Sequence, residues 1–337
     1  MRLWLSTALA VLLVASVLLT GCAGPAAPQT PQPPGPAASS PAPASSSTQT
    51  LTISGAFALY PLGVRWSEAY KEAHPETSFD VSAGGAGKGM TDVLSGAVDI
   101  AMVSREVRPE EIKQGAFPIG VTKDAVVYVI NEQNPVLAEL TRQGATAPKL
   151  APIWLSDKPG TWGALVGSTD KGGDQPIHPY TRADASGAGE IAAKYLGAKS
   201  QEELKGVAVQ GDPGLVEAVR KDSLGIGYNN IGFAYDPGAG KPVSGVRIVP
   251  LDLNNNGQVD SDEDFYASRS SIVKAIADGK YPSPPARVLY FVTKGQPSDS
   301  ARAFLAWVLK DGQKFVGEMG YVQLPDDVLQ AGLNKLK

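Results

Sequence analysis

The chain has 337 residues and a net charge of −4, with 30 Lys and Arg against 34 Asp and Glu. This balance argues against a nucleic-acid-binding protein, because no basic excess exists to neutralise phosphate backbones. Two histidines, His74 and His178, and one cysteine, Cys22, exclude most His- or Cys-ligated metal enzymes and any internal disulfide framework.

The first residues predict export and a lipid anchor. Arg2 is the only charged residue before an apolar run from Leu3 to Leu19, which has the length of a signal peptide. The run ends in Leu-Thr-Gly-Cys22, which resembles a bacterial lipobox. We expect residues 1–21 to be removed and Cys22 to carry lipid, on the outer face of the cell membrane or within the periplasm. An ordinary transmembrane anchor with a chance cysteine is the alternative.

Residues 22–49 are predicted to be a solvated linker. From Gly24 to Gln49 the chain has no charged residue and contains eight prolines among Ala, Ser, Gln and Thr. Such a composition cannot bury a core. We expect folded sequence to begin near Thr50.

Three strands, each followed by a loop and a helix, are predicted in the next sixty residues. The strands are 51–54, 79–82 and 98–103. The helix after the first strand reaches about Ala73, the helix after the second ends near Leu94, and the helix after the third begins at Pro109. This alternation indicates an α/β domain with a largely parallel sheet. Helix N-termini at the carboxyl ends of such strands favour an anion. Glycines that only make tight turns are the alternative for any single loop.

A fourth loop, residues 180–189, supplies a positive charge and leads into a helical pattern over 190–196. Arg182 can give two parallel hydrogen bonds to an oxyanion, and Asp184 is placed to hold its guanidinium group. Ser186 can offer hydroxyl and backbone donors at the helix start. A surface Arg–Asp pair beside an N-cap serine is the alternative.

These loops, together with residues 281–290 and 305–313, resemble the PstS-type phosphate-binding proteins of bacterial ABC transporters, over most of residues 50–337. The resemblance implies an α/β periplasmic-binding-protein fold of type II, with two lobes that close over a dehydrated oxyanion. Each lobe would be a mostly parallel sheet flanked by helices. Lobe 1 would combine 50–124 with 286–337, lobe 2 would be 125–285, and the hinge strands would lie in 123–131 and 287–294.

The resemblance also implies a phosphate site, carried over position by position. The implied residues are Phe57, Ala58, Ala86, Gly87, Ser104, Arg105, Arg182, Ser186, Gly187 and Ala188, with Asp184 in support. Hydroxyl residues usual in the family are replaced by alanine at 58, 86 and 188. Arg105 stands where well-studied members have an aspartate that accepts a proton from hydrogen phosphate. It could raise the affinity for a dianion or point into solvent, and selectivity for phosphate over sulfate is left open.

A twelve-residue segment, 252–263, fits the EF-hand loop at every constrained position. Its oxygen ligands would be Asp252, Asn254, Asn256, the Gln258 carbonyl, Asp260 and a bidentate Glu263. Gly257 would make the turn, a strand would precede the loop and a helix would follow it. We expect a structural Ca²⁺, and an acidic turn without metal is the alternative.

The sequence therefore predicts a monomeric, lipid-anchored receptor that captures inorganic phosphate and presents it to an ABC permease, without catalysis. Another oxyanion such as sulfate or molybdate, or a phosphate-sensing role, would keep the same fold. A secreted Ca²⁺-dependent phosphatase is the alternative of another class, and a purely adhesive lipoprotein is a third.

Overall fold

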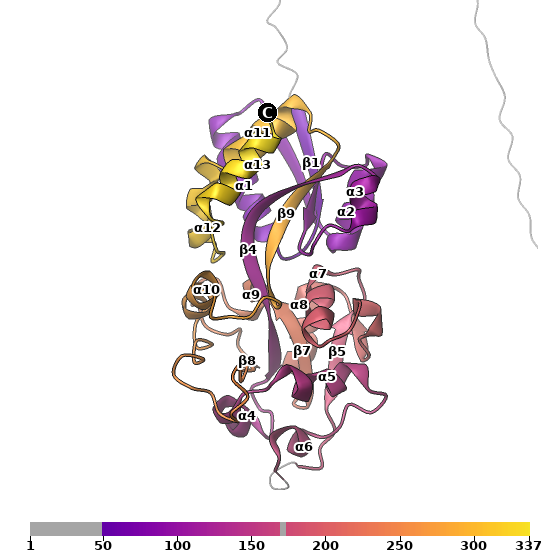
Figure 1. Cartoon of the computed structure of the whole chain (residues 1–337), viewed down its shortest axis with the longest axis vertical. Coiled ribbons are helices and arrows are strands. Elements are labelled where there is room, and N and C mark those ends of the chain that lie inside the picture. Colours follow the sequence, from indigo (N-terminus) through magenta and orange to yellow (C-terminus); the bar gives the residue numbers. More distant parts are fainter. Residues whose placement is uncertain (1–48, 169–172) are drawn as a thin grey trace, which may run out of the picture. The chain divides into compact units, whose positions relative to one another are not determined.

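The computed structural model describes residues 49–168 and 173–337 (Figure 1). The predicted signal peptide, Cys22 and nearly all of the predicted linker lie outside the described residues. No helix in the described part of the chain is long and apolar enough to span a membrane.

The described chain builds one mixed sheet of nine strands, in the order β2-β1-β3-β9-β4-β7-β5-β6, with β8 beside β4. The strands are β1 (Gln49–Gly55), β2 (Thr77–Ala83), β3 (Ile100–Val103), β4 (Ala116–Asn131), β5 (His178–Arg182), β6 (Val207–Val209), β7 (Gly225–Asn230), β8 (Val246–Ile248) and β9 (Ala286–Lys294).

Helices follow most of the strands and cover the sheet. They are α1 (Tyr60–Ala73), α2 (Ala86–Ser95), α3 (Pro109–Lys113), α4 (Leu137–Gln143), α5 (Ala147–Leu155), α6 (Trp162–Val166), α7 (Gly187–Tyr195), α8 (Gly211–Lys221), α9 (Ile231–Ala234), α10 (Arg269–Ala277), α11 (Asp299–Val308), α12 (Lys314–Glu318) and α13 (Asp326–Lys335). Two short 3₁₀ turns, η1 (Gln201–Glu203) and η2 (Asp311–Gln313), complete the set.

The predicted α/β class is confirmed, and the strand directions refine it. Strands β2, β1 and β3 are parallel, as are β7, β5 and β6. Between these groups β3, β9, β4 and β7 pair antiparallel. Within each parallel group, helices connect one strand to the next along the chain, as the connection rules require.

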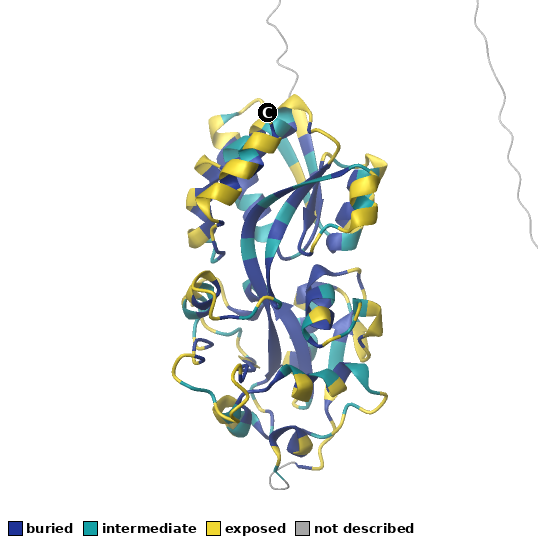
Figure 2. Cartoon of the chain, viewed as in Figure 1, coloured by how far each residue is buried: buried dark blue, intermediate teal, exposed yellow. Residues whose placement is uncertain are grey.

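Two hydrophobic cores lie within the described chain. The terminal core is built from 51–121 and 289–336 and includes Trp66 and Phe304. The central core is built from 125–286 and Val322, and includes Trp154 and Tyr228. The burial colouring shows dark strands in the middle of each core and exposed outer helix faces (Figure 2).

Strands β4 and β9 pass from one core to the other, side by side (Figure 1). Along β4, residues 116–121 contribute to the terminal core and residues 125–130 to the central core. Along β9, Ala286 lies in the central core and Leu289 in the terminal core. The crossing point falls where Asp124 pairs with Arg287 in the ladder.

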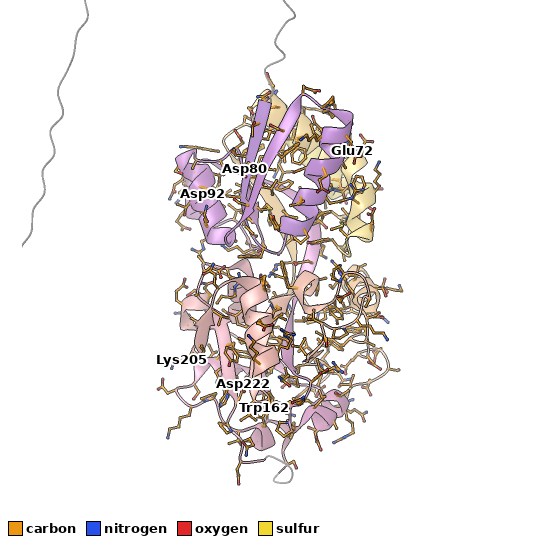
Figure 3. All side chains as sticks on the ribbon, turned by 180° about the vertical axis from the view of Figure 1, so that it is seen from behind. Glu72, Asp80, Asp92, Trp162, Lys205 and Asp222 are labelled. Atoms are coloured by element: carbon orange, nitrogen blue, oxygen red, sulfur yellow. The ribbon has the colours of Figure 1, made fainter. Side chains whose placement is uncertain are left out.

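The first helices begin as their sequences predict. Pro61 lies in the first turn of α1, where its missing N–H costs nothing. Gly85 precedes α2 with φ +97°, a conformation that favours glycine. Asp92, labelled in Figure 3, accepts a 2.6 Å hydrogen bond from Ser54 Oγ and so ties α2 to β1. This hydrogen bond fixes the position of α2 relative to the end of β1.

Candidate anion site

Four loops that follow β1, β2, β3 and β5 meet between the two cores. The Gly87 N–H, in the first turn of α2, donates a 2.9 Å hydrogen bond to the Ala185 carbonyl, which precedes α7. Gly187 packs so closely on Ser104 that an added Cβ would lie 2.1 Å from Ser104 Oγ. The structure therefore brings together loops from segments more than eighty residues apart.

Several backbone donors at this meeting point are left without an acceptor. Within 49–168 and 173–337, no protein group accepts from the N–H of six residues that the resemblance implied, nor does any side-chain or backbone group hydrogen-bond Ser104 Oγ. The six residues are Phe57, Ala58, Ala86, Ser104, Arg105 and Gly187. Unpaired N–H groups are uncommon where the chain is buried, so a ligand oxygen is their natural partner.

Two further predicted donors are already engaged. The Gly87 N–H serves the loop contact with Ala185, and the Ala188 N–H donates 3.1 Å to Ser186 Oγ. Ser186 also accepts from the Gly189 N–H and so acts as the N-cap of α7. Its hydroxyl hydrogen is still available as a donor.

Arg182 is buried at the end of β5 and is held by two carboxylates. Nε and Nη2 donate to Asp184 over 2.8 and 2.6 Å, and Nη1 donates to Asp212 over 2.7 Å. A guanidinium group has five N–H bonds in a planar fork, so these contacts leave one on Nη1 and one on Nη2. One N–H on each terminal nitrogen therefore stays available to hydrogen-bond an oxyanion.

The aromatic ring of Phe57 closes one side of this arginine. The Arg182 Cζ atom lies 5.3 Å from the ring centroid, within the range of a cation–π contact. Phe57 also meets Phe233 edge-on, with the ring centroids 6.3 Å apart, and lies against Gly211. The ring thus lies on a loop that follows β1 and contacts residues from the segment 125–286, which builds the central core.

Asp212 also belongs to the candidate site, although the sequence patterns did not predict it. It is fully buried in the first turn of α8, and its Oδ1 accepts a 2.9 Å hydrogen bond from the Asn230 N–H. Its Oδ2 holds Arg182. The available signal was an aspartate in a Gly-Asp-Pro sequence at a helix start, which is also an ordinary capping pattern.

Arg105 does not point into solvent, so that sequence-based alternative is wrong. Arg105 is 7% exposed, and its side chain forms a two-pronged pair with Glu111 of α3, over 2.9 and 2.6 Å. Burial alone would raise the pKa of Glu111, but hydrogen bonds from Arg105 and the Arg108 N–H lower it below its usual value. The Arg105 charge is therefore balanced by Glu111 within the part of the chain that builds the terminal core, called the terminal half below. The part that builds the central core is called the central half.

The EF-hand-like loop, residues 252–263, is a separate feature of the central half. Asp252 and Glu263, its first and last residues, are each 4% exposed. Asp252 accepts from the N–H groups of Asn256 and Gly257, and Glu263 accepts from those of Leu253 and Asn254. Gly257 has φ +82°, as the predicted turn requires.

The surroundings of this loop differ from the expected strand–loop–helix order. Strand β8 ends at Ile248 and α10 begins at Arg269. Pro250, which lacks an N–H, cannot extend the ladder, and Ser268 caps α10 further along. Among the described residues, no group of three or more His, Cys, Asp or Glu side chains is arranged to hold a metal ion.

Comparisons with known proteins agree with this architecture. Protein SphX of Synechococcus elongatus is 26% identical over 306 residues, covering 87% of this chain and 83% of that protein. The phosphate-binding protein PstS of Pseudomonas aeruginosa is 26% identical over 309 residues, and the match covers 87% of this chain and 88% of that protein.

A solved structure shares the fold. A putative phosphate ABC transporter substrate-binding protein from Clostridium perfringens, with bound phosphate, superposes with a TM-score of 0.65 at 20% identity. The match covers 82% of this chain and all of that one. The family model described as PBP superfamily domain matches residues 40–311, which is most of the chain. The chain therefore belongs to the PBP superfamily.

Proposed function

We propose that this protein is an extracytoplasmic receptor that captures inorganic phosphate between its two halves and delivers it to an ABC permease. The observation that carries the proposal is that six backbone N–H groups without a protein acceptor lie on loops that meet beside Arg182, which itself keeps two N–H bonds free. Preorganised donors of this kind recognise a tetrahedral oxyanion without making or breaking a covalent bond.

The relatives support phosphate as the ligand. The Pseudomonas aeruginosa protein is named a phosphate-binding protein, and the Clostridium perfringens structure contains phosphate. The site as described offers mostly donors, because Asp184 and Asp212 are engaged with Arg182. Sulfate and molybdate are therefore the ligands against which phosphate must be tested.

Calorimetric titration of residues 46–337, freed of bound anion, tests the proposal. We expect phosphate to bind and Arg182→Lys to weaken binding by at least about tenfold, because Lys cannot present two parallel donors. Arg247→Lys is the matched control, since Arg247 is half-exposed and pairs with Glu132 on the surface. Binding of sulfate or molybdate without phosphate would overturn the ligand, and no response to any oxyanion would overturn the function.

An enzyme is the alternative of another class, and the geometry favours a receptor. Both carboxylates beside Arg182 are committed to that guanidinium group and are buried, so neither is placed as a general base for an attacking water. We therefore propose that the protein releases no phosphate from phosphate esters. Tethering through lipid on Cys22, and action as a monomer beside the permease, remain part of the proposal and rest on the sequence.

We also propose a structural Ca²⁺ in the loop 252–263. Carboxylate, amide and carbonyl oxygens are the ligands that Ca²⁺ prefers, and the buried Asp252 and Glu263 are held in place by backbone N–H groups. Asn254 and Asn256 now direct Nδ2 toward Asp260 Oδ2, each over 2.8 Å. A half-turn of each amide would present oxygen instead.

The metal proposal is tested by thermal unfolding with Ca²⁺ and with a chelator. We expect Ca²⁺ to raise the melting temperature of the wild type, because an ion that binds only the folded state stabilises it. Glu263→Gln should abolish that rise. Asp262→Asn, at an exposed position that supplies no ligand, should keep it. An equal response of both variants would mean that Ca²⁺ acts elsewhere.

A further inference from the structure

A buried ion pair lies where the chain crosses between the two cores. Asp124 on β4 and Arg287 on β9 face each other in the ladder and are 1% and 6% exposed. Arg287 Nε lies 3.0 Å from Asp124 Oδ1, but the two atoms are not aligned for a hydrogen bond. Nη2 donates to Asp124 Oδ2 over 3.4 Å. The pair is therefore held mainly by charge.

Arg287 also reaches the candidate anion site in two directions. Its Nη1 donates a 3.2 Å hydrogen bond to the carbonyl of Gly187, whose own N–H is one of the six unpaired donors. Its Nη2 donates to Asn230 Oδ1. The Asn230 N–H donates to Asp212, which holds Arg182. A continuous line of buried polar contacts thus joins the crossing strands to the arginine of the site.

We propose that Arg287, fixed by Asp124, is a positioning residue for the anion site. It holds the Gly187 peptide at the start of α7, and through Asn230 and Asp212 it holds the Arg182 guanidinium. This inference rests on the proposed function, because it assigns a role in binding the anion.

A merely structural role is the weaker explanation of the pair. Replacing a buried ion pair by packed apolar residues is often neutral or stabilising, so stability alone is a poor reason for this pair.

Four charged or titratable groups act on Asp124: Arg287 of β9, Asp212 of α8, Arg269 of α10, and Tyr321. Burial raises the pKa of Asp124 to about 6, against the opposing effect of Arg287. Its charge therefore changes in a pH range where binding can be measured.

The first experiment compares phosphate affinity in two variants, one at Arg287 on β9 and one at a buried position on the neighbouring strand β4. Arg287→Lys keeps the charge but cannot serve Asp124, Gly187 and Asn230 together, so we expect the dissociation constant to rise about tenfold or more. Thr122→Val is the matched control on β4. It removes one buried hydrogen bond, 2.8 Å to the Val322 carbonyl, and should lower stability without changing affinity.

The second experiment uses the isosteric Asp124→Asn variant and the pH dependence of affinity. Phosphate itself changes its protonation state with pH. That change affects both proteins equally, so it cancels in the ratio of their dissociation constants. We expect the ratio of variant to wild type to be near one at pH 5, where Asp124 is largely protonated. At pH 7.5 it should rise to about threefold or more, because the charge that fixes Arg287 is absent.

The outcomes separate the two hypotheses. If the wild type binds no oxyanion, the proposed function fails. If it binds phosphate and Asp124→Asn shows a ratio of one at every pH, Arg287 does not depend on Asp124 and the inference is wrong. A ratio below one at pH 7.5 would show that Asp124 acts by repelling the anion, which also overturns positioning. Should Arg287→Lys fail to fold, the Asp124→Asn ratio still decides.

Discussion

At the scale of single residues, the site depends on close approach as much as on charge. Gly187 supplies an unpaired N–H, accepts from Arg287 and lies against Ser104 of the other half. A side chain there would occupy space that Ser104 already fills. The absence of a Cβ is therefore what allows α7 to meet the end of β3.

The variant Gly187→Ala tests this contact. An added Cβ would lie 2.1 Å from Ser104 Oγ and 2.5 Å from its carbonyl oxygen, so the halves cannot approach as they do. We expect phosphate affinity to fall by about tenfold or more while the protein stays folded. Gly214→Ala on α8 is the control, because its nearest neighbour would lie 4.0 Å away and Ala favours a helix. Unchanged affinity in Gly187→Ala would contradict the view that phosphate binding needs the close contact of Gly187 with Ser104.

Asp124 also predicts how stability changes with pH. Its pKa is raised from 3.8 to about 6 by burial, so between these values the folded chain keeps a proton that the unfolded chain has lost. The contribution of Asp124 to stability is present below about pH 4 and is lost as pH rises through 6. At about 1.4 kcal/mol per pKa unit, the loss is about 3 kcal/mol. Urea unfolding from pH 4.5 to 7.5 should show a shallower decline for Asp124→Asn, and parallel curves would contradict this.

At the scale of elements, α7 joins the two halves on its outer surface as well. Glu190 of α7 pairs with Arg108, which lies between β3 and α3, and Lys194 of α7 lies 3.3 Å from Glu106. These pairs are partly exposed, and such pairs are worth about 0.2–1 kcal/mol each. They are expected to favour the closed arrangement only slightly, and less so as salt is added.

Replacing Glu190 by Gln should therefore raise the dissociation constant for phosphate, by no more than about fivefold, the equivalent of about 1 kcal/mol. The difference from the wild type should shrink at about 1 M salt, where screening is short-ranged. Glu217→Gln is the matched control. Its partners Arg220 and Lys221 lie on the same helix, α8, so that substitution leaves the contact between the halves unchanged. A salt-independent effect would point to a steric cause.

Local patterns were enough to predict many of the elements. Some features depend only on residues next to them in the chain, so the elements they form can be predicted from the sequence. Examples are Pro61 in α1, the glycines before α2 and the apolar run of β3. The pairing of Asp184 with Arg182 could also be predicted from the sequence, since only one residue separates them. The sequence did not predict the roles of three other residues, because those roles arise from contacts between segments far apart in the chain. These residues are Asp212, Asn230 and Arg287. The inward turn of Arg105 likewise depends on Glu111, which the α3 packing brings to it.

At the scale of the whole molecule, the predicted fold class holds and the family match agrees with it. What the sequence could not predict is the order of strands in the middle of the sheet. Strand β9, near the end of the chain, lies between β3 and β4 and pairs with both. Hydrophobic periodicity predicts that a strand exists but not which neighbours it finds.

The position of β9 has a consequence for the order in which the chain can fold as it is made. Residues 125–286 supply the central core almost alone, whereas the terminal core needs both early and late segments. Until β9 is synthesised, β3 and β4 have no strand to join them, and the apolar faces of the first three strands are incompletely covered. A nascent chain that stops short of residue 286 is therefore left with a half-built sheet. Such a chain would depend on factors that hold it in a soluble state until residues 286–337 have been synthesised.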